Sequence, residues 1–241
     1  MTTFVLLHGA FEGGWIWQRV ARKLRAVGHD VFTPTLTGCG ERAHLLHPDI
    51  TLATHVDDVV NVFEMEDLHD VVLVGHSYGG TVVTVVADRV ANRVQHLVYL
   101  DASAPDAGQA STGAFAEGTD DKLAEMASGD DAFLPPLPLA AVGITDDADI
   151  AWVEPRRRPH PVRTLHEPVV LSGATPSHAI TYVEHTRNEE MVRLFGVNPL
   201  APFVDKAKER GWGLARIDAG HDAMVTHAEE VAQVLTTLES T

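Results

Sequence analysis

Short apolar runs alternate with amphipathic segments along most of this 241-residue chain. The apolar runs predict a sheet of about six strands, at residues 4–7, 30–36, 71–74, 96–101, 179–184 and 214–218. The segments between them carry apolar residues at helical spacing and predict helices at residues 17–27, 54–68, 81–91, 199–210 and 226–238. Strands and helices that alternate in this way form βαβ units. The pattern therefore predicts an α/β fold with a mainly parallel sheet and helices on both faces.

Polar residues and glycine predict where some of these helices begin and end. Gly28 stands in the usual stop position after the first helix. Thr54 can cap the start of the second helix with its side chain. The sequence Thr226-His227-Ala228-Glu229 has the spacing of a capping box, so we expect it to begin the last helix.

The regular alternation stops near Ala104-Pro105 and resumes near residue 176. Residues 106–175 are acidic, rich in proline and weakly periodic, with short helices predicted at 120–127 and 146–153. We interpret this segment as a lid inserted over the carboxyl edge of the sheet, between core segments 1–105 and 176–241. Within it, Asp130-Asp131 and the run Arg156-Arg157-Arg158 are most simply solvated surface.

One strand leads directly into a turn that carries a serine between glycines. The apolar run that begins at Val71 ends in Gly75-His76-Ser77-Tyr78-Gly79, and a helical segment follows at once. This strand–turn–helix arrangement is called a nucleophile elbow, because the sharp turn lifts the serine hydroxyl clear of the backbone. A Cβ atom at either glycine would collide with neighbouring backbone. The flanking strand and helix, rather than the short motif alone, favour Ser77 as a nucleophile.

A serine hydroxyl needs a base to accept its proton, and the chain has 14 histidines from which to choose. In an open parallel sheet, ligands bind beyond the carboxyl ends of the strands, so the base should follow a strand directly. His221 does so after the last predicted strand, and its position late in the chain suits a serine hydrolase of this type. We therefore predict that His221 is the general base. The alternative is a loop histidine that only caps a turn.

A carboxylate is needed to orient the imidazole, and the sequence offers two candidates. Asp101 closes an apolar strand, where a carboxylate is costly unless it is paired or hydrogen-bonded. We predict Asp101 as the acid, with a capping role at the lid entrance as the alternative. After the fifth strand an amide, Asn188, occupies the most natural position for the acid, and Glu189 is the second candidate.

The oxyanion of an acyl-transfer intermediate requires two preorganised donors. We predict the backbone N–H of Tyr78, which follows the nucleophile, and the N–H of Ala10 in the loop after the first strand. His8 either supports this loop through hydrogen bonds or is an ordinary residue at the end of the strand, and we favour the second interpretation. For the substrate pocket we predict the following side chains, although they could equally form the core of the lid: Phe11, Trp15, Leu137, Leu139, Val142, Ile144 and Trp152.

Composition narrows the class of protein and its partners. Of the residues, 45% are hydrophobic and 22% charged, which is ordinary for a globular protein. The net charge of −16 argues against a nucleic-acid or anionic membrane surface. A single cysteine, Cys39, excludes an internal disulfide, and the N-terminus resembles neither a signal peptide nor a membrane span. We expect a cytoplasmic monomer or homodimer with no metal and no cofactor, since no histidines show metal-ligand spacing.

Five segments together match a known family pattern. They are Leu6-Leu7-His8-Gly9-Ala10 with Gly13-Gly14-Trp15-x-Trp17, Leu36-Thr37-Gly38-Cys39-Gly40-Glu41-Arg42, Gly75-His76-Ser77-Tyr78-Gly79-Gly80, Tyr99-Leu100-Asp101-Ala102 and Gly220-His221-Asp222-Ala223-Met224. On these motifs the chain resembles the α/β-hydrolase superfamily over essentially its full length. Within it, the chain is similar to the compact esterase branch that includes plant methyl esterases, hydroxynitrile lyases and bacterial pyrethroid-type carboxylesterases.

Two departures from the family pattern bear on mechanism. Family members commonly hold the acid where Asn188 stands, and plant relatives have a small apolar residue where this chain has Asp101, so the resemblance implies that the acid has been relocated. Hydroxynitrile lyases use a threonine where Gly9 stands and a lysine where Asp222 stands, so the lyase activity loses its supporting residues. The resemblance implies a cofactor-independent serine hydrolase that cleaves a small to medium apolar carboxylic ester. Lactone or thioester hydrolysis, acyl transfer and non-catalytic ligand binding are the alternatives.

Overall fold

A six-stranded sheet forms the centre of the protein, in the order β2-β1-β3-β4-β7-β8 with every neighbouring pair parallel. The computed structural model describes residues 1–112, 119–128 and 132–238. The strands of the sheet are β1 (Thr3–Leu7), β2 (Asp30–Phe32), β3 (Val71–Ser77), β4 (Val94–Ala102), β7 (Ala179–His185) and β8 (Gly213–Ile217). The predicted parallel sheet of about six strands is confirmed.

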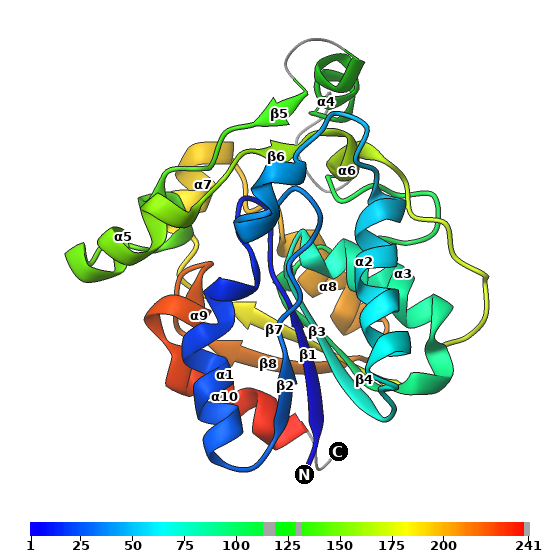
Figure 1. Ribbon diagram of the computed structural model, residues 1–241. Helices are drawn as coiled ribbons and strands as arrows, with labels where there is room; N and C mark the ends of the chain where they lie inside the picture. The colour runs from blue at the N-terminus through cyan, green and yellow to red at the C-terminus, as the bar shows by residue number, and fades with distance from the viewer. Residues whose placement is uncertain (113–118, 129–131, 239–241) are drawn as a thin grey trace.

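Helices cover both faces of this sheet (Figure 1). The α-helices are α1 (Gln18–Ala26), α2 (Leu52–Met65), α3 (Gly79–Arg89), α4 (Thr119–Ser128), α5 (Asp147–Val153), α6 (Arg163–His166), α7 (Glu189–Phe195), α8 (Ala201–Glu209), α9 (Ala223–Thr226) and α10 (Ala228–Thr237). Short 3-10 helices are η1 (Gly14–Trp17), η2 (Gly40–Leu45), η3 (Ala91–Arg93), η4 (Leu139–Val142) and η5 (Glu154–Arg156). The figure shows α1 and α10 on one side of the sheet and α2 and α3 on the other.

The alternation of side chains along each strand divides the buried core between these two faces. On β1, Val5 and Leu7 pack with the residues of α2, α3 and α8, whereas Phe4 and Leu6 pack with those of α1 and α10. Because successive side chains of a strand point to opposite faces, a strand buried on both sides is apolar at every position. This explains why β1 and β3 appear in the sequence as continuous apolar runs.

Several element boundaries differ from the sequence expectation. Helix α2 is capped by Thr51, and Thr54 is the reciprocal partner at the third position of the capping box rather than the cap. The predicted capping box at Thr226 is wrong, because Thr226 ends α9 and its hydroxyl contacts the ring of His227 instead of a helix N–H (2.8 Å). Helix α7 was not predicted, and β2 ends at Phe32 rather than Leu36.

The elements that the structure describes between residues 119 and 166 lie beyond the carboxyl ends of the strands, toward the top and upper left of Figure 1, whereas residues 167–175 run down beside α3, where Ser172 bonds to Asp88. The elements beyond the strand ends include α4 and α5, the two short helices expected there, and an antiparallel pair formed by β5 (Phe133–Leu134) and β6 (His160–Pro161). Asp130 and Asp131 lie outside the described residues. The interpretation of Arg156–Arg158 as solvated surface is wrong for Arg157, whose guanidinium lies over the ring of Phe11 (5.8 Å from the centroid) and donates to the carbonyl of Leu137.

Candidate active site

Ser77 ends β3 with a left-handed backbone (φ 53°), and α3 begins two residues later. A non-glycine residue rarely adopts this conformation, which persists where the surrounding structure imposes it. Close packing imposes it here, because a Cβ on Gly75 would lie 2.7 Å from the carbonyl oxygen of Gly79. A Cβ on Gly79 would lie 2.5 Å from the carbonyl oxygen of His8. The structure thus bears out the steric roles expected of both glycines.

Asp101 lies beside this turn because of an irregularity in the neighbouring strand. His76 pairs with Leu100 and Ser77 with Ala102, so Asp101 is an extra residue on β4. It forms a bulge and also has a positive φ (43°). The bulge re-aims its side chain, and its Oδ2 accepts a hydrogen bond of 2.6 Å from Nδ1 of His221. The structure therefore joins the two residues that the sequence proposed as base and acid.

The charge distribution favours ionisation of this pair. Burial alone would raise the pKa of Asp101, but the hydrogen bond and charge of His221, with the hydrogen bond from the backbone N–H of His185, lower it overall. Burial alone would lower the pKa of His221, but the hydrogen bond and charge of Asp101, with the charge of Asp222, raise it overall. Since a carboxylate can only accept, Nδ1 of His221 carries its proton and Nε2 holds the lone pair that a general base needs.

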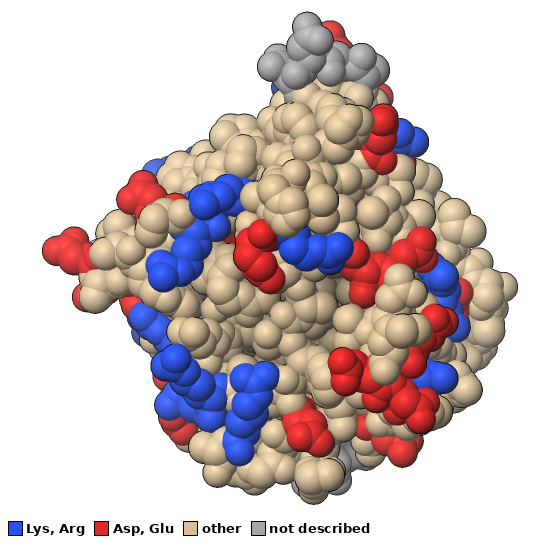
Figure 2. Space-filling view, in the orientation of Figure 1, with Lys and Arg blue, Asp and Glu red and all other residues tan. Residues whose placement is uncertain are grey.

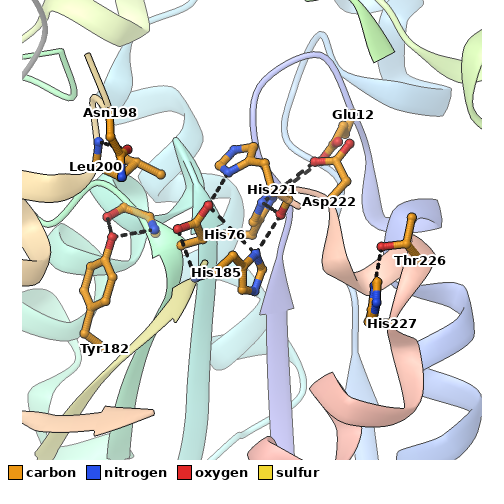
Figure 3. Close-up of polar contacts among 12 residues, drawn as sticks. Glu12, His76, Tyr182, His185, Asn198, Leu200, His221, Asp222, Thr226 and His227 are labelled. Atoms are coloured by element: carbon orange, nitrogen blue, oxygen red, sulfur yellow. Dashed lines mark hydrogen bonds and ion pairs between the residues drawn. The ribbon is translucent and has the colours of Figure 1, made fainter. Parts of the chain in front are cut away.

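Two further histidines, neither of which was predicted from the sequence, hold the main chain of His221. The carbonyl oxygen of His221 accepts hydrogen bonds from Nε2 of His76 (3.1 Å) and Nδ1 of His185 (3.0 Å). The backbone N–H of His185 also donates to Oδ1 of Asp101 (3.3 Å). Burial lowers the pKa of both histidines, so they act as neutral donors. Figure 3 shows both residues below the ring of His221, close to its main chain. A polar residue at the buried end of a strand, the signal that identified Asp101, would have identified them too.

The loop after β1 lies against the elbow and contains the expected oxyanion donor. Ala10 and Tyr78 both line the cavity that contains Ser77 and His221. His8, interpreted as an ordinary strand-end residue, in fact braces this loop: Nδ1 donates to the carbonyl of Gly9 (2.7 Å), and Nε2 accepts from the N–H of Leu36 (3.1 Å). Burial lowers the pKa of His8 to about 4, so the ring can make one donor and one acceptor contact at neutral pH.

The cavity above Ser77 has a volume of about 270 Å³ and an almost entirely apolar wall. Phe11 and Leu137, two of the predicted pocket residues, line it. Trp15 and Trp152 do not line this cavity, so their assignment to it is corrected. Their rings pack edge to face, with 5.4 Å between the centroids, and the guanidinium of Arg19 lies over the ring of Trp152. Both indoles therefore pack against each other and against α1 instead of facing the cavity. Side chains missed by the sequence analysis, Leu123, Leu134, Leu165, Met191, Phe195 and Leu200, complete the wall.

One group of residues in the described part of the chain has the proximity of a metal site. Single ligand atoms of His76, His221 and Asp222 lie within 4.8 Å of one another. However, Nε2 of His76 is engaged by the carbonyl of His221, and Nδ1 of His221 is engaged by Asp101. These two hydrogen bonds account for the close approach of the three side chains, so a bound metal ion is not needed to explain it.

The fold and this site define a class: an α/β enzyme with a serine on a strand-to-helix turn and a histidine–aspartate pair at the adjacent strand ends. The chain belongs to the alpha/beta hydrolase family, whose model matches residues 4–234. A carbendazim-hydrolysing esterase of Nocardioides sp. is 36% identical over 99% of this chain and 100% of that protein. Methylesterase 10 of Arabidopsis thaliana is 33% identical over 42% of this chain and 38% of its own. An extracellular α/β-hydrolase structure from a Paenibacillus species superposes with a TM-score of 0.76 at 23% identity, covering 98% of each chain.

Substitution of Asp101 tests which carboxylate serves His221. Asp101→Asn should lower kcat by roughly 10²–10⁴, because the amide no longer stabilises the imidazolium or fixes its tautomer. Glu189→Gln is the matched control, since Glu189 is exposed on the first turn of α7 and should change kcat little. Steady-state kinetics on one ester, with circular dichroism to check folding, would measure both. Equal, small effects would show that Asp101 is not the acid.

Proposed function

We propose that the protein cleaves neutral, apolar carboxylic esters of small to medium size, with Ser77 as nucleophile, His221 as general base and Asp101 as the orienting acid. The chain is an ester-hydrolysing α/β-hydrolase, as its family and its full-length esterase relative indicate. The observation that carries the proposed roles is the 2.6 Å hydrogen bond between His221 and Asp101, next to the cavity that contains Ser77.

The reaction proceeds through an acyl-enzyme. His221 Nε2 takes the proton of Ser77 as the hydroxyl attacks the ester carbonyl, and the N–H groups of Tyr78 and Ala10 stabilise the oxyanion. The imidazolium then protonates the leaving alcohol. In the second half, His221 deprotonates a water that attacks the acyl-enzyme and releases the acid. Asp101 stays ionised throughout and stabilises the imidazolium.

The cavity supports a neutral substrate. Among the described residues that line it, none is charged, and the polar ones are hydroxyl-bearing side chains and His221. The hydroxyls of Ser103 and Thr112 donate to the backbone carbonyls of Ser111 and Leu165, so they are already satisfied within the protein. A charged substituent placed against this wall would lose hydration without a compensating partner. Apolar acyl or alcohol groups fit it best.

Residues 106–175 act as a lid in this proposal. They supply Leu123, Leu134, Leu137 and Leu165 to the cavity wall, from elements that lie beyond the strand ends. Such a cover excludes water from the oxyanion and strengthens its contacts with the two N–H donors.

Gly9 favours hydrolysis over the lyase activity found in some relatives. A Cβ at this position would lie 2.9 Å from Cβ of Ser77 and 3.1 Å from Nδ1 of His76. A threonine there would therefore displace the nucleophile in this backbone. Asp222 also replaces the lysine expected of a lyase.

We further propose a cytoplasmic monomer or homodimer that binds neither nucleic acid nor membranes and needs no metal or cofactor. The single cysteine, Cys39, is buried, which is compatible with a reducing compartment. Figure 2 shows basic side chains gathered at the lower left of the face it displays and acidic ones at the lower right, and the net charge is −16. Among the described helices, none has the length and apolar character to cross a bilayer.

A fluorophosphonate probe tests the nucleophile directly. The folded wild-type protein should be labelled on Ser77 and lose esterase activity in proportion to labelling, because only an activated serine reacts. Ser77→Ala should neither be labelled nor hydrolyse esters above the background rate. If mass spectrometry locates the label on another residue, or if Ser77→Ala remains active, the proposed function is refuted.

A panel of esters with increasing acyl or alcohol length tests the cavity. Leu137→Ala should change the ratio of kcat/KM between long and short esters by about tenfold, since it removes apolar contact from the wall. Trp152→Ala is the control from the same segment, and it should leave this ratio unchanged even if stability falls. An identical length preference in wild type and Leu137→Ala would show that another surface binds the substrate.

A further inference from the structure

Two carboxyl side chains are buried behind the His221 imidazole, in addition to Asp101. Glu12 follows the oxyanion loop and is 3% exposed, and Asp222 follows His221 directly and is 1% exposed. Figure 3 shows their carboxyl groups side by side, next to the ring of His76. Neither residue has a place in the acyl-transfer steps described above. Two buried carboxylates are costly, so their persistence beside the general base requires an explanation.

The contacts of this pair connect it with His221 through His76. Oε2 of Glu12 lies 3.8 Å from Nδ1 of His76, and Oδ1 of Asp222 lies 3.9 Å from Nε2. The His76 ring packs against that of His221, with 4.5 Å between the centroids. A potential ligand atom of Asp222 also lies within 4.8 Å of one on His221. The pair is therefore close enough for a charge on it to act on the base.

The protonation state follows from the partners available. The carboxyl groups of Glu12 and Asp222 lie side by side, so a proton held by one of them would let it donate a hydrogen bond to the other. With both deprotonated, Oε2 of Glu12 and Oδ2 of Asp222 have no hydrogen-bond donor among the described residues. Burial, followed by the charge of Asp222, raises the pKa of Glu12 well above its usual range. Burial also raises the pKa of Asp222, but the charges of His221 and Arg157 oppose this. Because Nε2 of His76 donates to the carbonyl of His221, Nδ1 of His76 carries a lone pair, and it faces Oε2 of Glu12 at 3.8 Å. A neutral, protonated Glu12 suits this lone pair better than a carboxylate does, so we assign the proton to Glu12.

We propose that Glu12 and Asp222 are positioning residues that share one proton and retain one negative charge, which stabilises the His221 imidazolium during acyl transfer. This inference rests on the proposed role of His221 as general base. The charge acts from behind the ring, whereas Asp101 acts at Nδ1, so the two carboxylates stabilise the cation from different directions. A carboxyl–carboxylate pair does this with a single net charge, at a lower cost of burial than two ionised groups.

Other charged and titratable groups face the pair from every element around it. His76 on β3 and His185 on β7 are neutral, because burial lowers the pKa of each. His8 at the end of β1 is neutral for the same reason. Arg157, after η5, lowers the pKa of both carboxyl groups and is the cation that partly offsets their charge. Asp101 on β4 is a further anion, and its charge raises the pKa of Asp222. The shared proton keeps the total charge near His221 from becoming more negative.

Two nearly isosteric substitutions test the negative charge of Asp222 and the proton of Glu12 separately. Asp222→Asn removes the negative charge, so the acidic limb of the kcat/KM profile should move to lower pH and the plateau should fall by roughly threefold to tenfold. Glu12→Gln replaces a neutral donor by another neutral donor, so the acidic limb should stay at its wild-type position. A merely structural pair would give both variants the same limb as wild type, with only stability or KM altered.

The His221 imidazole can also be titrated without turnover. In a Ser77→Ala background, NMR titration of His221, assigned by comparison with His221→Ala, should show a lower pKa in Asp222→Asn and an unchanged one in Glu12→Gln. A shift in Glu12→Gln equal to that in Asp222→Asn, or no shift in Asp222→Asn, overturns the inference. If Asp222→Asn fails to fold, a shift of the acidic limb of the kcat/KM profile in Glu12→Gln is by itself sufficient to overturn the inference. Because the titration needs no catalysis, its outcome is independent of whether Ser77 is the nucleophile.

Discussion

The hydrogen bond between Nδ1 of His221 and Oδ2 of Asp101 is the interaction on which the site depends. It fixes the tautomer that leaves Nε2 free to accept a proton, and it makes the pKa of the base higher than burial alone would allow. The oxyanion loop and the apolar cavity are useful only if that nitrogen is correctly placed. Neutral donors from His76 and His185 hold the carbonyl of His221, so its main chain and side chain are both restrained.

This hydrogen bond requires strained backbone on two adjacent strands. Ser77 and Asp101 both have positive φ, and the register shift between β3 and β4 lies between the pair His76–Leu100 and the pair Ser77–Ala102. Such conformations cost about 1–3 kcal/mol each and persist only where packing enforces them. The enforcement comes from close approach: a Cβ on Gly80 would lie 2.2 Å from the carbonyl oxygen of Ser103, and Ser103 in turn donates its N–H to the carbonyl of Ser77. Strain at the elbow and strain at the bulge are therefore one feature of the fold.

Much of this arrangement could be predicted from sequence, and the reasons for success and failure are physical. Ser77 and Asp101 stand at the ends of apolar strands and His221 follows β8, and in a parallel sheet such strand ends meet at one edge. The contact between Glu12 and Asp222 could not be predicted, because it depends on how the oxyanion loop folds over the last strand. The assignment of Trp152 to the substrate pocket failed because helical spacing does not tell which of two apolar surfaces a lid residue faces.

The proton between Nδ1 of His221 and Oδ2 of Asp101 can be observed directly. A short hydrogen bond to a buried carboxylate strongly deshields its proton, so the wild-type protein should give one low-field proton NMR resonance. That resonance should be absent from His221→Ala and from Asp101→Asn, and present in Glu189→Gln. If it persists in Asp101→Asn, or disappears in Glu189→Gln, Asp101 is not the residue that orients the base and the account is contradicted.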